Sequence, residues 1–503
     1  MLLYSKLLIF FHFTKSKSRR DIMLRKVFSV LLSIILCASL IACNGAQDSA
    51  PTKTSSSEAE ATEVAKPVDE TESVPAEDAD TMDTGDTQLI KLAIGTNRIE
   101  WIEGELEAFK AENPGTEIEI IEIVSGSDMY AKITMMMQSE QTSPDVISED
   151  GFMINSDAAA GYLQSLDEIV SANSDFENFV PAIMDGAKGA DGQQYGIPFS
   201  TDVQGIWYNK NLLAQAGVSV PFEPKNWDEI MDAAIKLKAL GDSELIPVFL
   251  YGSKTHPEET SMRTFQALYS GTGSQLYDYG TEKWIVDKEN LLHVFNFIND
   301  VYNVEQVGPP LSVASQQSIG DLFRSDYMQN DKLGLYFSGS WESGQWGAGK
   351  THDWPEGLDV WGFAKIPTVD GREPGYTSMS GGWTWAIPTN ANNKEGAKAL
   401  LEFVSSKDVQ LSYNLFSGDL AVRSDVMEDS TYSSQPMSVV NESAEIMNYT
   451  HFRPSVEGYS TITGMYTEIV ESIAMGSATP EQAIENFESE LKRIIGEENV
   501  TVK

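Results

Sequence analysis

The chain has 503 residues and a formal net charge of -40, with 75 acidic residues against 35 lysines and arginines. A surface this acidic repels nucleic acid and anionic lipid, and it disfavours anionic ligands unless a local basic pocket exists. The part beyond residue 87 is longer than one hydrophobic core usually supports, so we expect two domains.

The N-terminal segment has the residue pattern of an export signal. An apolar run from Val27 to Ala42 follows Arg25 and Lys26. This order of a basic flank and a short apolar core is typical of a secretory signal peptide, and the run is shorter than the roughly 20 residues of a membrane-spanning helix. We therefore expect a signal peptide over 1–42, with Met23 as an alternative start because residues 1–22 fit the pattern poorly.

The apolar run ends in Leu40-Ile41-Ala42-Cys43, which resembles the lipobox of bacterial lipoproteins. That resemblance implies cleavage before Cys43 and lipidation of its thiol, and a two-chain lipid suffices for stable anchoring. A free cysteine after an ordinary signal peptide is the alternative. Cys37 would be removed with the signal, so the exported part has no internal disulfide.

Residues 43–87 are predicted to be the lipidated cysteine and a disordered acidic linker. The segment after Cys43 is rich in Ser, Thr, Ala, Glu, Asp and Pro, with only isolated apolar residues. It cannot bury enough apolar surface to fold and repels itself, so it acts as a spacer.

Alternating strands and helices follow. A strand over 89–94 ends at Gly95, a helix carries an apolar stripe, and a second strand covers 117–124 after the turn Asn113-Pro114-Gly115. This strand–helix–strand order favours a parallel sheet. A short buried strand over 144–148 comes next. Later helices begin after Asn226 and Thr479, which have the composition of N-caps.

A long ordered set of motifs then identifies a family. It includes Tyr195-Gly196-Ile197-Pro198, Trp207-Tyr208-Asn209-Lys210, Trp227-Asp228-Glu229, Leu335 to Trp341, and Gly381-Gly382-Trp383. In this order the motifs resemble the extracellular solute-binding proteins of ABC importers, in the carbohydrate-binding group that includes maltose-binding protein. The resemblance covers the chain from about residue 88 onward.

The resemblance implies an α/β fold of type II, in which two lobes each contain a mainly parallel sheet flanked by helices and enclose a ligand cleft. We expect 88–199 and about 341–385 in the N-terminal lobe, and about 202–338 and 388–503 in the C-terminal lobe. Later crossings between the lobes are expected near 338–341 and 383–388. Closure around ligand would occur by hinge motion.

A sugar site needs aromatic platforms together with planar donors and acceptors. The resemblance places a stacking tryptophan at Trp341, with hinge packing as the alternative, and an acidic hydroxyl acceptor at Asp202, with capping as the alternative. Glu149 and Asp150 follow a strand at the sheet's carboxyl end, where α/β clefts lie, and one of them is expected to face ligand.

Four further residues complete the candidate set. Trp383 contacts either ligand or core, and Asn97 contacts ligand or caps a turn. Arg423 and Glu342 are expected first as structural residues and second as ligand contacts. A tryptophan that many maltose-type relatives carry is not evident around 462–465, which leaves the sugar open.

Two other functions are compatible with a cleft that contains several carboxylates. A glycoside hydrolase would need a carboxyl pair at a set separation, which sequence cannot show. A binding protein for another solute, such as a polyamine or peptide, also fits an acidic cleft. The histidines beyond residue 43 lack metal-ligand spacing, so no metal or cofactor is expected.

The resemblance implies a monomeric binding protein that is not an enzyme. Its partners would be a carbohydrate, a permease pair with a separate ATPase, and the membrane through the lipid at Cys43. We expect it on the outer face of the membrane of a Gram-positive cell, without nucleic-acid partners.

Overall fold

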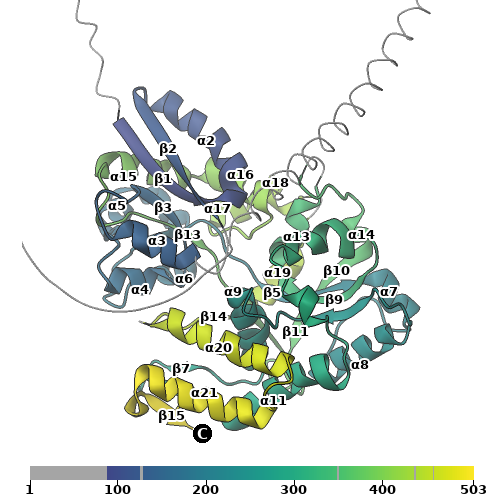
Figure 1. The fold of residues 1–503 in the computed structure, drawn as a ribbon. Coiled ribbons are helices and arrows are strands. Elements are labelled where there is room, and N and C mark those ends of the chain that lie inside the picture. Colours follow the sequence, from purple (N-terminus) through teal and green to yellow (C-terminus); the bar gives the residue numbers. More distant parts are fainter. Residues whose placement is uncertain (1–87, 125–128, 348–349, 436–437, 457) are drawn as a thin grey trace, which may run out of the picture. The chain divides into compact units, whose positions relative to one another are not determined.

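The computed structural model describes residues 88–124, 129–347, 350–435, 438–456 and 458–503 (Figure 1). The expected signal peptide, Cys43 and the linker to residue 87 lie outside these ranges. Within them, none of the helices combines the length and the apolar character that a membrane span requires.

The first lobe is built on a five-stranded sheet in the order β2-β1-β3-β13-β4. β1 runs parallel to β2 and β3, and β13 lies antiparallel between β3 and β4. The predicted strands match the first three of these within two residues at each end. The strands are β1 (Gln88–Gly95), β2 (Thr116–Ile123), β3 (Val146–Asp150), β4 (Gly196–Pro198) and β13 (Trp383–Ala386).

Helices cover this sheet on both faces (Figure 1). The predicted apolar stripe of α2 is buried, and α15 and α16, from much later in the chain, pack beside α2 and β1. The helices of this lobe are η1 (Thr96–Arg98), α2 (Ile99–Glu112), α3 (Met129–Met137), α4 (Ile154–Ala159), α5 (Asp167–Ala172), η2 (Ser174–Asn178), α6 (Pro181–Asp185), α15 (Lys394–Val404), α16 (Lys407–Ser417), α17 (Ser424–Met427) and α18 (Ser430–Ser433).

The second lobe contains a four-stranded sheet in the order β10-β5-β9-β6, where β5 is antiparallel to both of its neighbours and β6 is parallel to β9. Two three-stranded sheets flank it, β11-β12-β14 and β15-β8-β7. The strands are β5 (Gln204–Asn209), β6 (Ile246–Phe249), β7 (Tyr277–Asp278), β8 (Lys283–Val286), β9 (Leu333–Gly339), β10 (Trp361–Ala364), β11 (Ile366–Pro367), β12 (Tyr376–Ser380), β14 (Thr450–Phe452) and β15 (Val500–Val502).

Most strands of each sheet run in one direction, as expected, and one strand opposes the others: β13 in the first lobe and β5 in the second. β5 begins where the chain leaves the first lobe, and β9 ends at the same place, because Gln204 pairs with Gly339. Two strands that start and end at one junction must run in opposite directions. Both are fully buried, and buried strands of either direction have the same apolar pattern.

The helices of the second lobe include three π-helical segments, η3, η4 and η5. The capping box predicted at Asn226 is only half formed, because Glu229 accepts from the Lys225 amide, whereas Thr479 and Gln482 form a complete one. The helices are α7 (Lys210–Gln215), α8 (Trp227–Lys238), α9 (Pro257–Glu259), η3 (Thr260–Gln266), α10 (Ala267–Ser270), α11 (Lys288–Asn299), η4 (Asp300–Val304), α12 (Leu311–Ala314), α13 (Ile319–Leu322), η5 (Phe323–Tyr327), η6 (Ser340–Gln345), α14 (Gly357–Val360), α19 (Val440–Ile446), η7 (Met447–Tyr449), α20 (Tyr459–Ala474), α21 (Pro480–Ile495) and η8 (Glu497–Asn499).

The later lobe boundaries differ from those expected. Most of 341–385 belongs to the second lobe, since β10 pairs with β5 and both Trp346 and Trp361 are buried in that lobe's core. Conversely, α15 and α16 belong to the first lobe. An apolar stripe shows that a helix is buried but not which core receives it, so spacing alone could not divide this region.

The chain passes between the lobes at 199–203, at 380–383, and between α18 and α19. The crossing expected near 338–341 is wrong, because η6 turns back into the second lobe after β9. The crossing near 383 lies just before the expected range. Gly382 has φ +147°, and a Cβ there would fall 2.1 Å from the Ser200 carbonyl oxygen, so the two crossings touch at a point only glycine fits.

Candidate functional site

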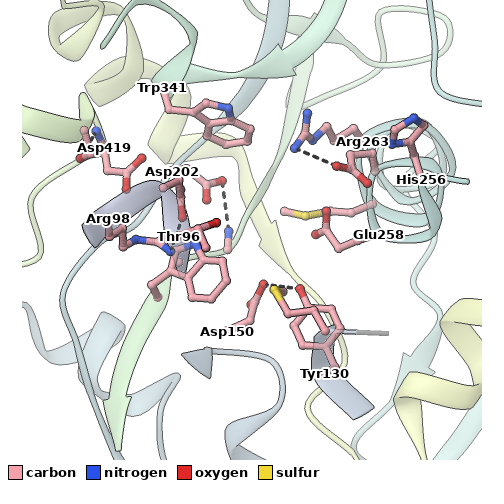
Figure 2. A pocket seen from close by; sticks show the side chains of 18 of the residues that line it. Thr96, Arg98, Tyr130, Asp150, Asp202, His256, Glu258, Arg263, Trp341 and Asp419 are labelled. Atoms are coloured by element: carbon pink, nitrogen blue, oxygen red, sulfur yellow. Dashed lines mark hydrogen bonds and ion pairs between the residues drawn. The ribbon is translucent and has the colours of Figure 1, made fainter. Parts of the chain in front are cut away.

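A cleft of about 1480 Å³ lies between the two lobes. The first lobe contributes the loop after β1, helix α3, the end of β3, Trp383 and the end of α16. The second lobe contributes η3 and the segments around Asp202, Trp341 and Arg453 (Figure 2). Cavities for drug-sized ligands are usually about 300–1,000 Å³, so this cleft has room for more than one sugar ring.

Three arginines in the cleft each lie over an aromatic ring. The Cζ atoms of Arg98, Arg453 and Arg263 are 4.0, 4.0 and 4.8 Å from the ring centroids of Trp383, Phe152 and Trp341 respectively. A guanidinium over a ring face is attracted by the ring quadrupole and restrains both side chains. The cleft therefore presents aromatic rings in fixed orientations.

Arg453 joins the two lobes through charged hydrogen bonds. Its Nη2 donates to Asp150 Oδ1 of the first lobe and its Nη1 to Glu258 Oε1 of the second, each at 2.9 Å. The Tyr130 hydroxyl donates to the other oxygen of Asp150 at 3.0 Å. Burial, followed by the charge of Asp150, raises the pKa of Tyr130, so this phenol stays a donor.

Asp202 lies within the first crossing and near Arg453, since a Cβ on Gly381 would be 3.5 Å from Asp202 Oδ2 and 3.1 Å from Arg453 Nη2. Its carboxylate accepts from the Gly381 amide and from Gln204 Nε2, both at 3.3 Å. Burial raises the pKa of Asp202 to about 7, and the nearby carboxylate of Asp419 contributes to the shift. Asp202 is therefore poised to exchange a proton when a ligand donor arrives.

Asp419 is linked to Arg98 through a tyrosine. The Arg98 Nε donates to the Tyr413 hydroxyl at 3.0 Å, and that hydroxyl donates to Asp419 Oδ2 at 2.6 Å. Burial raises the pKa of Asp419, while the charge of Arg98 opposes the shift. This chain of hydrogen bonds fixes the Arg98 guanidinium and the Asp419 carboxylate in the lining of the cleft.

The structure brings five of the predicted site residues to this cleft: Asn97, Asp150, Asp202, Trp341 and Trp383. They come from five separated stretches of sequence and lie on both lobes. The exposed side chain of Asn97 also accepts a hydrogen bond from Arg98 at 3.4 Å. Their common location is compatible with the ligand contacts expected for them.

Glu149 does not line the cleft. Its side chain is fully buried on the opposite face of β3 from Asp150, next to Asp157 of α4. Neighbouring residues of a strand point to opposite faces, so only one of the pair could face the cleft. Burial and then the adjacent Asp157 raise the pKa of Glu149 well above its ordinary value, which favours the protonated carboxyl.

Arg423 and Glu342 also lie outside the cleft lining. Arg423 is fully buried and donates to Asp175 and Asp425, each at 2.7 Å. Glu342 is buried next to Trp341 and accepts from Arg324 at 2.8 Å and from the Ser338 hydroxyl at 2.5 Å. These contacts fix local structure and leave neither group free for ligand.

Sequence reasoning missed most of the charged and aromatic groups of the cleft. Arg98 directly follows Asn97 in the loop after β1, so its position was the most accessible to prediction. The others come from helices and loops of the second lobe or from helix ends, with no motif around them: Tyr130, Phe152, Glu258, Arg263, Asp419 and Arg453.

Comparison with known proteins identifies the fold. Residues 95–411 match the family model described as bacterial extracellular solute-binding protein. A solute-binding protein of Thermotoga lettingae bound with alpha-D-tagatose is 23% identical, with a TM-score of 0.70 over 81% of this chain and 100% of that one. The maltose-bound MalE3 of T. maritima is 22% identical, with the same TM-score and coverage.

A relative by sequence is the arabinooligosaccharide-binding protein of Halalkalibacterium halodurans. It is 20% identical over 428 residues, which are 81% of this chain and 89% of the relative. The solved structures share the two-lobe α/β fold, and the family model covers more than half of the chain. The protein belongs to the bacterial extracellular solute-binding proteins.

Proposed function

We propose that this protein captures a saccharide, most simply an oligosaccharide, between its lobes and delivers it to the permease of an ABC importer. The observation that carries the proposal is the interlobe cleft, which combines aromatic rings with carboxylates and guanidiniums. A pyranose offers an apolar face to such rings and hydroxyls to such polar groups. The relatives that are named for sugars support the same class of ligand.

In this proposal Trp341 and Trp383 pack against sugar rings, while Asp202, Asp150 and Asn97 bind hydroxyl groups. Closure of the lobes buries the sugar and creates the surface that a permease recognises. No bond of the sugar is made or broken.

A cationic solute such as a polyamine is the alternative. It would need carboxylates free to pair with ammonium groups, but Asp150 and Glu258 already share Arg453 as their cation, and burial raises the pKa of Asp202 to about 7. The cleft therefore favours hydroxyl-rich ligands over polycations.

Isothermal titration of the purified chain with a panel of oligosaccharides and with spermidine tests the proposal. We expect an oligosaccharide to bind, and Trp341→Ala to weaken it by roughly tenfold or more through lost ring contact. Tyr279→Ala, an exposed aromatic outside the cleft, is the matched control. Binding of spermidine alone, or steady release of reducing sugar, would overturn the assignment.

We further propose that Cys43 carries a lipid that holds the protein at the outer face of the membrane as a monomer. Tethering raises the concentration of the receptor near its permease, which is most useful in a Gram-positive cell. Labelling cells with a tagged fatty acid should mark the wild type and not Cys43→Ser. Equal labelling of both proteins would contradict the anchor.

A further inference from the structure

We infer that the saccharide held in this cleft carries an anionic group, a carboxylate or a phosphate, and that Arg263 binds it. The inference rests on the proposed function and specifies the chemical class of its ligand. It assigns Arg263 as the residue that distinguishes acidic from neutral saccharides.

Arg263 is held in a defined orientation at the edge of the site. It lies on the π-helix η3, a type of segment that often occurs at functional sites, and its guanidinium reaches the cleft (Figure 2). Its Cζ is 4.8 Å from the Trp341 ring centroid and 5.3 Å from that of Tyr251. Contact with two rings restrains the plane of the guanidinium before any ligand arrives.

Arg263 makes no direct hydrogen bond to a carboxylate among the described residues. Its Nε is buried and has no hydrogen-bond partner there. Its ion-pair partner is Glu259, at 3.8 Å, which is beyond hydrogen-bond distance. The neighbouring Glu258 already accepts from Arg453 at 2.9 Å. The Arg263 side chain is 14% exposed and lines the cleft, so its guanidinium can form charged hydrogen bonds with a bound anion.

The other arginine on this side of the cleft provides an internal comparison. Arg324 donates to Glu342 at 2.8 Å and lies 3.6 Å from Asp321. Arg324 is therefore paired at hydrogen-bond distance with a buried carboxylate of the protein. Both arginines line the cleft, and Arg263 differs from Arg324 in having no such partner among the described residues.

The position beside Trp341 indicates which part of a ligand Arg263 meets. A sugar ring that packs near Trp341 places its exocyclic substituents within reach of the guanidinium. The planar fork of arginine matches a carboxylate or phosphate with two parallel hydrogen bonds. A neutral hydroxymethyl group at this point offers the guanidinium no anionic acceptor, so we expect the neutral saccharide to bind more weakly.

The test compares matched ligands on the intact chain by isothermal titration. Uronate-containing di- and trisaccharides are each paired with the carboxyl-reduced neutral saccharide, and hexose phosphates with the free hexoses. We expect an acidic member to bind at least tenfold more tightly than its neutral partner. Preference for uronates identifies a carboxylate, and preference for hexose phosphates identifies a phosphate.

Two substitutions locate the effect. Arg263→Met should lower affinity for the acidic saccharide about 100-fold and for its neutral partner less than threefold, and Arg263→Lys should lie between them. Arg372→Met removes the same charge outside the cleft lining and should change neither. The wild-type comparison needs no variant, so poor folding of Arg263→Met leaves the test intact.

The failures are distinguishable. Equal or tighter binding of the neutral saccharides overturns this inference and leaves the proposed function standing. Equal loss of both ligands in Arg263→Met shows that the residue only supports Trp341, which also overturns it. Absence of binding by every saccharide refutes the proposed function and the inference with it.

Discussion

Arg453 of the second lobe and Asp150 of the first form an ion pair of 2.9 Å in which both side chains are more than nine-tenths buried. Asp150 is the last residue of the buried strand β3, and Arg453 follows the short strand β14. The pair connects the two lobes, which also meet at the chain crossings and through the hydrogen bond from Lys350 Nζ to the Phe416 carbonyl. The ion pair and the other buried groups should affect both the stability of the protein and its affinity for ligand.

Removing Arg453 should destabilise the protein strongly. Arg453→Met leaves Asp150 and Glu258 buried without their cation, and breaking a buried pair in this way costs about 3–5 kcal/mol. Urea unfolding measures the loss. Lys188→Met, which breaks the exposed pair with Asp185, should cost at most about 1 kcal/mol. Similar losses in both variants would show that the interlobe ion pair contributes no more to the free energy of unfolding than an exposed ion pair.

Ligand affinity should rise with pH through neutrality because of Asp202. Its pKa of about 7 lies above the ordinary 3.8, and a sugar hydroxyl donates to the ionised carboxylate. Binding therefore releases a proton, and affinity should increase about tenfold between pH 6 and pH 8. Asp202→Asn should give a flat profile, and an unchanged slope in that variant would exclude Asp202 as the titrating group.

The stability of the ligand-free protein should change with pH in the opposite direction to the affinity. A carboxyl whose pKa is raised by folding contributes its full stability below the unfolded value and loses it as pH rises toward the folded value. Asp202 should thus make the ligand-free protein less stable as pH increases from about 4 to 7. The melting temperature across this range, compared between the wild type and Asp202→Asn, checks the direction.

Glu149 should show the same dependence without any effect on ligand. Its raised pKa comes first from burial and then from Asp157, so stability declines as pH rises above the ordinary 4.5 toward the folded value. Glu149→Gln keeps the shape, removes the ionisation and should flatten the stability profile. Glu117→Gln on the exposed face of β2 is the control, and an equal change in both would contradict the assignment.

Gly382→Ala should disrupt the crossing between the lobes. The added Cβ would meet the Ser200 carbonyl oxygen at 2.1 Å, and φ +147° is strained for alanine. We expect destabilisation of at least about 2 kcal/mol in urea unfolding. Gly104→Ala, with open space in helix α2, should stabilise by about 0.5–1 kcal/mol. A neutral effect of Gly382→Ala would show that the crossing can adjust.

Arg423→Met should separate structure from binding. The guanidinium holds Asp175 and Asp425 far from the cleft lining, so its loss should lower the melting temperature while the affinity of the remaining folded protein is unchanged. Trp341→Ala should do the opposite. If Arg423→Met instead weakened the ligand in proportion to Trp341→Ala, its structural role would be rejected.

The fold was largely accessible from the sequence because its local signals agree. The apolar stripe of α2 is buried and Thr479 caps α21, both as predicted. The direction of each strand in the second lobe could not be predicted from the sequence. β5 and β9 are buried on both faces, so apolar and polar residues do not alternate along them. Which lobe α15 packs against depends on long-range contacts, and the spacing of apolar residues along the helix does not reveal them.

The site was only partly accessible for a related reason. Asp150 and Glu149 are adjacent, and the pleat decides which one faces the cleft, so sequence could name the pair but not the member. Trp341 and Asp202 were reached through the family motif around them. Arg263 and Arg453 lie where no motif marks them, and only the folded structure shows that they meet these residues.

The position of β13 has a consequence for the order of events during synthesis. This strand lies between β3 and β4, yet β4 ends at Pro198 and β13 begins only at Trp383. Until residue 386 has been made, β3 and β4 lack the strand that joins them, and the first lobe cannot close its sheet. The first lobe therefore completes its sheet only after most strands of the second lobe have been synthesised.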